Sequence, residues 1–206
     1  LCPDQAGSAS PGAGGALEAE FLEQQLGAKP LDGTESAVRT LLRGGDFDLL
    51  HFSGHGVADP LDSSSAKLVL TRATGGGGVE KLRYLTARAV EQNAKLRRDD
   101  GSGPLVVLNA CRVGQSGLSL TGMGGWAKVL VQDCHVGALL APMWEISDDL
   151  AREFAAAFYR ATVGTPGSTL AQAVRAARQH IRGLRPHDPT WLAYALYAHP
   201  NARLVW

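Results

Sequence analysis

Two short apolar runs, each followed by a residue capable of nucleophilic or acid–base chemistry, constrain this chain most. FDLLHF (47–52) leads into the string HFSGHG, which contains His55, and PLVVLNA (104–110) leads into Cys111 and the following RVG. Apolar runs of this length are typical of strands buried on both faces of a parallel sheet. Both residues are therefore predicted to follow strand ends, the edge at which open α/β sheets carry their chemistry.

The two residues together indicate cysteine-based catalysis. A thiol is nucleophilic only as its thiolate, and an imidazole is the commonest group that takes its proton and later protonates the leaving amine. We therefore predict that Cys111 and His55 form a catalytic dyad. The alternatives are that Cys111 is a buried core cysteine, or that His51 supplies the imidazole. We interpret His51 as an inner-strand residue with satisfied hydrogen bonds, and we expect no metal site because the sequence places no third ligand.

The order of the motifs resembles a known family. His-Gly after an apolar strand, Ala-Cys-Arg-x-Gly after a later one, the segment GGWAKVLVQDCHVGALLAPMWEISDDLAREFAAAFYRA and the final DPTWLAYALYAHP are similar to the CHAT subgroup of caspase-like cysteine peptidases. The similarity extends from about Glu18 to Leu204. It implies an α/β fold, a caspase-like three-layer sandwich whose mostly parallel sheet carries helices on both faces.

The resemblance also implies roles for backbone groups and for an acidic cluster. The N–H groups of Gly56 and Cys111 would form an oxyanion hole, and no cofactor would be needed. Glu145, Asp148 and Asp149 follow a strand in the region that shapes the pocket for the residue before the scissile bond, where carboxylates would favour Arg or Lys. The alternative is that the two aspartates only stabilise the start of the next helix, with Ser147 as its cap.

The remaining pattern alternates helices and strands, as an α/β fold requires. Helices are predicted at 16–26, 34–43, 85–98, 122–132, 148–163 and 168–183, and strands at 47–52, 67–70, 104–109, 136–143 and 191–198. Loops at 75–78 and 97–103 are predicted to be flexible enough to order around a substrate. Residues 1–15 read as a flexible linker or the remnant of a first strand, and 16–206 as the peptidase domain.

Other chemistry-bearing residues are assigned structural roles. Cys134 and His135 are adjacent, and neighbouring side chains on an extended chain diverge, so they are not expected to form a dyad. Asn109 is interpreted as structural, because it could orient the strand end or form a local hydrogen bond.

Bulk composition narrows the partners. The 206 residues include 20 basic and 20 acidic side chains, so no charge imbalance favours a nucleic acid or an anionic membrane. Three cysteines argue against a disulfide framework and for a reducing compartment, which indicates the cytoplasm. No apolar run approaches the ~20 residues of a membrane span.

These observations lead to one expected function and one alternative. We expect a cysteine endopeptidase that cleaves a protein or peptide substrate. It would be the carboxy-terminal effector of a longer bacterial signalling or defence protein, with the sensor or repeat domain upstream that the resemblance implies. The alternative is a catalytically silent CHAT-like interaction module. A flavodoxin-like nucleotide-binding domain would need a phosphate loop such as G-x-x-x-x-G-K, which the sequence lacks.

Overall fold

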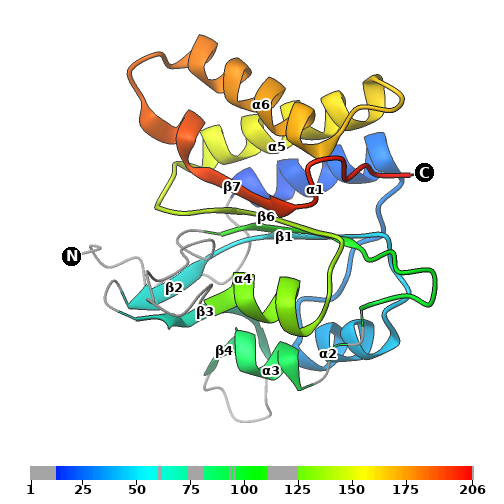
Figure 1. Cartoon of the computed structure of the whole chain (residues 1–206). Coiled ribbons are helices and arrows are strands. Elements are labelled where there is room, and N and C mark those ends of the chain that lie inside the picture. The colour runs from blue at the N-terminus through cyan, green and yellow to red at the C-terminus, as the bar shows by residue number, and fades with distance from the viewer. Residues whose placement is uncertain are drawn as a thin grey trace.

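The computed structural model in Figure 1 describes residues 13–59, 62–73, 81–92, 94, 96–110 and 125–205. Its helices are α1 (Ala13–Leu26), α2 (Glu35–Gly44), α3 (Ala87–Glu91), α4 (Gly125–Ala127), the π-helix η1 (Lys128–Asp133), α5 (Asp148–Gly164), α6 (Leu170–Leu184) and the 3₁₀-helix η2 (Pro189–Leu192). Its strands are β1 (Leu49–Ser53), β2 (Gly56–Asp59), β3 (Asp62–Ala73), β4 (Lys81–Thr86), β5 (Leu105–Asn109), β6 (Ala138–Pro142) and β7 (Tyr194–Ala198).

The main sheet has four strands in the order β1-β5-β6-β7. β5 runs parallel to both β1 and β6, and β7 runs antiparallel to β6 at the edge. All residues of β5 and β6 are buried, as the apolar runs predict for strands covered on both faces. The mostly parallel sheet expected from the sequence is confirmed.

Helices cover both faces of this sheet (Figure 1). Side chains alternate along β5, so that Leu105 and Val107 face α1, α5 and α6, whereas Val106 and Leu108 face α2, α3, α4 and η1. Each side has its own apolar cluster. The expected α/β three-layer sandwich of caspase-like type is therefore confirmed.

A second, antiparallel sheet in the order β2-β3-β4 adjoins the end of β1, and its extent differs from the sequence prediction. The helix expected at 85–98 is wrong, because residues 81–86 form β4 and, among the described residues of this segment, only 87–91 are helical. Leu85 pairs with Leu68 of β3 and is buried there, so tertiary pairing outweighs local helical preference. The helix begins only after Thr86, whose side chain accepts the N–H of Ala89.

The remaining helices agree closely with expectation. α2 is capped by Thr34 and ends at Gly45, which has a φ of 65°. α1 begins at Ala13, so the last three residues of the expected linker 1–15 are helical, and residues 1–12 lie outside the described residues. The predicted helix 122–132 is represented by α4 and by η1, a π-helix instead of an α-helix.

The two strands that meet at the sheet centre begin with a very close backbone contact. A Cβ added to Gly103, just before β5, would lie 2.6 Å from the backbone nitrogen of Gly137, just before β6. The N–H of Gly137 also donates to the carbonyl of Pro104 over 3.0 Å. Glycine is required here for close approach, which sets the spacing of β5 and β6.

Candidate active site at the carboxyl ends of β1 and β5

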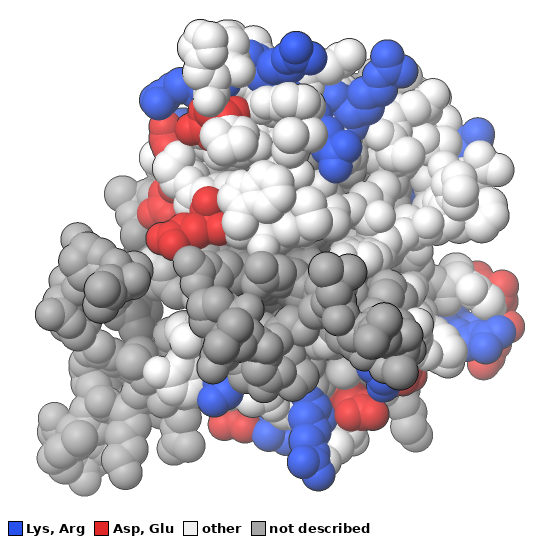
Figure 2. Space-filling view, turned by 60° about the vertical axis from the view of Figure 1, so that its left-hand side comes forward, with Lys and Arg blue, Asp and Glu red and all other residues white. Residues whose placement is uncertain are grey.

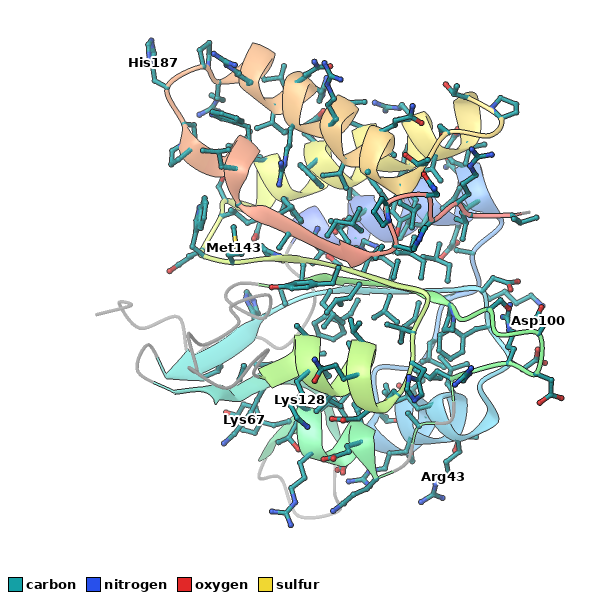
Figure 3. The ribbon with its side chains drawn as sticks, in the orientation of Figure 1. Arg43, Lys67, Asp100, Lys128, Met143 and His187 are labelled. Atoms are coloured by element: carbon teal, nitrogen blue, oxygen red, sulfur yellow. The ribbon has the colours of Figure 1, made fainter. Side chains whose placement is uncertain are left out.

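The parallel strands β1, β5 and β6 place their carboxyl ends at one edge of the main sheet. Figure 3 shows Met143, which follows β6, at this edge and Asp100, which precedes β5, at the opposite one. The last register pair of β1 and β5 is Ser53 with Asn109, and the N–H of Gly54 donates to the carbonyl of Asn109 over 3.2 Å. The two strands therefore stay paired up to the points where the predicted catalytic residues follow.

His55 lies in the short link between β1 and β2, and it is exposed. Its carbonyl accepts a hydrogen bond of 2.9 Å from the N–H of Val69 in β3. This bond fixes the backbone of His55 while the imidazole remains accessible to a substrate.

Cys111 and the segment up to residue 124 lie outside the described residues. The chain is described up to Ala110, which is buried directly after β5. In the sequence, Cys111 follows Asn109 by two residues, as His55 follows Ser53.

Gly56 is the first residue of β2 and pairs with Leu68. The neighbouring pair is hydrogen-bonded through the N–H of Val69 and the carbonyl of His55. Because hydrogen-bonded and non-hydrogen-bonded pairs alternate in an antiparallel ladder, the N–H of Gly56 is directed away from β3, towards the outer edge of β2.

A buried carboxylate lies directly behind these strand ends. Glu18, from α1, is only 3% exposed. Its Oε1 accepts a hydrogen bond of 2.8 Å from Nδ2 of Asn109 and lies 3.1 Å from Nε2 of His51. Its Oε2 accepts a short hydrogen bond from the hydroxyl of Ser53. One side chain thus contacts both β1 and β5 at their carboxyl ends.

Two buried tyrosines extend this network. The hydroxyl of Tyr159, on α5, lies 2.8 Å from Nδ1 of His51, and the hydroxyl of Tyr194, on β7, donates to Oδ1 of Asn109 over 2.6 Å. Nδ1 of His51 is therefore hydrogen-bonded, whereas the buried Nε2 lies close to the Glu18 carboxylate without making a hydrogen bond, so the expectation of a fully satisfied inner-strand residue holds for one ring nitrogen only. Asn109 is hydrogen-bonded to Glu18 and Tyr194, which are far away in the sequence, so its structural role does not rest on a local bond.

The electrostatics of the network favour a charged carboxylate. Burial on its own raises the pKa of Glu18, but the hydrogen bond and charge of His51, together with the hydrogen bonds from Ser53 and Asn109, lower that pKa below its ordinary value. Burial and the charge of Glu18 raise the pKa of Tyr159 well above its ordinary value. Glu18 is therefore an anion at neutral pH, and Tyr159 keeps its proton.

The sequence prediction did not include Glu18. A signal was present, because Glu18 lies four residues before Leu22 and eight before Leu26, on the apolar stripe of α1. A carboxylate on an inward-facing stripe requires a buried partner, and identifying that partner requires the tertiary structure.

The three acidic candidates lie at the same edge of the sheet and are all exposed. Asp148 and Asp149 occupy the first turn of α5, and Glu145 precedes it. Asp149 lies 3.4 Å from Nη2 of Arg185, and its pKa is lowered by a hydrogen bond from Ser147. Ser147 stands at the N-cap position with the two aspartates in the first turn, as the capping alternative expects, although its side chain makes no capping hydrogen bond.

Other residues and loops lie away from this edge. Cys134 is buried below η1, whereas His135 is exposed with a φ of 58°, which confirms that this pair is not a dyad. The loop at 97–103 is folded by a hydrogen bond of 3.0 Å from the N–H of Arg98 to the carbonyl of Ser102, and it lies at the opposite end of the sheet (Figure 3). It is therefore not placed to order around a substrate. The Gly75–Gly78 loop lies outside the described residues.

A cavity of about 740 Å³ runs beside β1, is lined by residues 46–55 and reaches His55. On the face shown in Figure 2, charged side chains of both signs are scattered among uncharged ones. Within the described residues, no cluster of His, Cys, Asp and Glu could hold a metal ion, and no helix is long and apolar enough to cross a membrane.

The three-layer sandwich, with a histidine following the parallel strand β1 next to β5, places the chain in the caspase-like class. The sequence model of the CHAT domain matches residues 9–203. The chain therefore belongs to the CHAT domain family, a family of caspase-like peptidases. No curated protein matches this sequence.

Proposed function

We propose that the chain is a cysteine endopeptidase in which Cys111 is the nucleophile and His55 the general acid and base. The observation that carries the proposal is the pairing of Ser53 with Asn109 at the ends of β1 and β5. Each proposed catalytic residue follows its strand end by the same two positions. Family membership and the exposure of His55 support the same conclusion.

In the proposed reaction, His55 takes the proton of the Cys111 thiol, and the thiolate sulfur bonds to the carbonyl carbon of the scissile peptide. The N–H groups of Gly56 and Cys111 donate to the oxyanion, for which the outward direction of the Gly56 N–H is suited. Protonated His55 then donates to the amine as the C–N bond breaks. Water, deprotonated by His55, hydrolyses the thioester and restores the thiol. The side chains supply every proton transfer in this scheme.

Substitution of the proposed dyad tests the mechanism. Cys111→Ala and His55→Ala should each lower the cleavage rate by about 10⁴-fold or more, since both residues act as one unit. Turnover should be measured on a fluorogenic peptide library and on protein substrates identified from their new amino termini, with folding checked by circular dichroism.

Matched controls are available in the chain. Cys134→Ala and His187→Ala, which change a buried thiol and an exposed imidazole away from the strand ends, should keep near-normal turnover. Full activity in a folded Cys111→Ala protein would exclude the mechanism. An inactive wild type whose Cys111 also fails to react with a thiol-directed activity probe would favour the alternative, a catalytically silent interaction module.

The proposal for specificity is that the acidic residues after Trp144 select Arg or Lys before the scissile bond. Asp148 is the first choice, because Asp149 already has Arg185 and Ser147 as neighbours. Glu145 is the alternate. Asp148→Asn should reduce cleavage after basic residues selectively, whereas Asp149→Asn, the matched control, should not. A wild-type preference for apolar or acidic residues in a peptide library would refute this assignment.

The biological setting is proposed on family resemblance. The domain would act in the cytoplasm as the effector of a regulated bacterial signalling or defence system, on protein or peptide substrates, under control of an upstream sensor or repeat domain. Isolated domain should then turn over more slowly than activated full-length protein. Equal rates for the two would argue against such control.

A further inference from the structure

We infer that Glu18 is a positioning residue, which holds the ends of β1 and β5 together so that His55 and Cys111 stand at a fixed separation. The inference rests on the proposed function. It concerns a side chain that contacts Ser53 and Asn109 and so acts through the strands that precede the two proposed catalytic residues.

One carboxylate joins two strands. Oε2 accepts from the Ser53 hydroxyl on β1, and Oε1 accepts from Asn109 Nδ2 on β5 over 2.8 Å. Ser53 and Asn109 are also the final register pair of these strands. The carboxylate therefore crosses the sheet at the last residues before the chain leaves for the proposed site.

The partners of Glu18 are themselves fixed. His51 lies 3.1 Å from Oε1 on one side and has Tyr159 on the other, 2.8 Å from Nδ1. Asn109 is held by Tyr194, whose ring stacks on Phe154 with centroids 3.6 Å apart. A network tied to α1, α5 and β7 leaves the strand ends few alternative positions.

The net stability that the buried network can supply is small. A buried ion pair contributes little net stability relative to apolar residues of similar volume, because desolvating two charges offsets their attraction. Replacing Glu18 and its polar partners together by apolar side chains would therefore serve the fold as well. The carboxylate fixes the relative position of the two strands, because its oxygens accept hydrogen bonds from defined donors on each of them. An error of about 1 Å in catalytic geometry can lower a rate by about 10²-fold.

The role of α1 follows from the same contacts. Helix α1 packs on α5 and β1 (Figure 1), and Glu18 is the side chain through which it reaches both strand ends. A movement of α1 would pull the carboxylate away from Ser53 and Asn109 together. The position of this helix would then set the geometry of the proposed dyad.

The test compares Glu18→Gln with Glu20→Gln, an exposed glutamate on the same helix. In folded Glu18→Gln, kcat should fall by about 10- to 100-fold with KM nearly unchanged. Glu20→Gln should match the wild type. The same proteins are then alkylated with iodoacetamide from pH 5 to 10, and the rate at Cys111 is read by mass spectrometry of its peptide.

The alkylation profile distinguishes a positioning role from a structural one. A dyad in place gives Cys111 an inflection below the free-thiol value of about 8.5, and Glu18→Gln should move it towards that value while the protein stays folded. A lowered inflection that Glu18→Gln leaves unmoved would overturn the positioning role alone. A wild-type inflection at the free-thiol value would overturn the dyad and the positioning role together.

Milder variants cover the case in which Glu18→Gln does not fold. Ser53→Ala and Tyr194→Phe each delete one hydrogen bond of the network. Each should give a smaller fall in kcat, in the same direction and with the same shift of the Cys111 profile. No change of kcat or profile in either folded variant would overturn the role of the network.

Discussion

The two faces of the main sheet are built differently. On the face covered by α2, α3, α4 and η1, the strands contribute apolar side chains such as Val106, Leu108 and Leu139. On the face covered by α1, α5 and α6, the same strands also contribute His51, Ser53 and Asn109, which meet a buried carboxylate. All four buried polar or charged residues of the described chain, Glu18, Asn109, Thr162 and Thr190, belong to elements on this second side or point towards it.

The difference teaches how one sheet can serve packing and chemistry together. Because successive side chains of a strand point to opposite faces, polar residues at alternate positions leave the other face entirely apolar. The apolar face stabilises the fold through burial of its side chains. The polar network on the other face adds little net stability to the apolar cluster around it, but it fixes distances between strand ends, where the proposed reaction takes place.

The largest expected effect is on the apolar face. Leu139 is completely buried, so Leu139→Ala should lower the free energy of unfolding by about 2–5 kcal/mol through lost transfer energy and a residual cavity. Turnover per folded molecule should stay within a few-fold of the wild type. Tyr194→Phe should lower the free energy of unfolding by only about 1 kcal/mol but should clearly reduce kcat. Denaturant unfolding and active-site titration measure the two quantities separately.

If Leu139→Ala and Tyr194→Phe lost the same amount of stability and the same amount of turnover as each other, the two faces would not have separate roles. Leu170→Ala supplies a matched control, because this leucine is buried on the polar side of the sheet but outside the network. It should behave as Leu139→Ala does, with a loss of stability and near-normal turnover per folded molecule.

Local sequence pattern predicted elements on both faces of the sheet. The apolar runs before His55 and Cys111 identify β1 and β5 as strands, and β5 is buried along its whole length, as such a run predicts, whereas β1, at the sheet edge, is only partly buried. Helices α5 and α6 follow from their apolar stripes, and the position of His55 after β1 follows from the strand end. These features depend on local pattern alone.

The polar network was not predictable in the same way. Glu18 and Asn109 are 91 positions apart, and no local pattern links them. β4 was missed for the same reason, since residues 81–86 become a strand only by pairing with β3. Both features are set by contacts between distant segments, which a single sequence does not display.

A second prediction concerns acid and sharpens the contrast between the faces. The folded-state pKa of Glu18 lies below its ordinary value of 4.5, so its carboxylate stabilises the folded state fully above that value. The stabilisation is lost as the pH falls through the folded-state pKa. The difference in unfolding free energy between wild type and Glu18→Gln should therefore shrink as the pH is lowered from 6 to below 4. Glu20→Gln should track the wild type throughout, because Glu20 is exposed and lies outside the buried network.

Denaturant unfolding at a series of pH values supplies the measurement. A difference between wild type and Glu18→Gln that stays constant down to pH 3 would contradict an ionised, stabilising Glu18. A difference that grows on acidification would reverse the sign and indicate that burial, which opposes ionisation, prevails over the contacts with His51, Ser53 and Asn109.

The smallest expected effect concerns the thiol on the apolar face. Burial, with further contributions from Asp133 and Glu91, raises the pKa of Cys134 to about 11. At pH 8 only about one molecule in a thousand then carries the thiolate. Cys134→Ala should change the free energy of unfolding by about 1 kcal/mol and leave turnover unchanged. In folded wild type, iodoacetamide at pH 8 should modify Cys111 long before Cys134, and Cys134 should react quickly only after denaturation. Rapid labelling of Cys134 in the folded protein would show that the apolar face opens readily. It would contradict the expectation that this face is rigid while Cys111, at the edge of the sheet, is reactive.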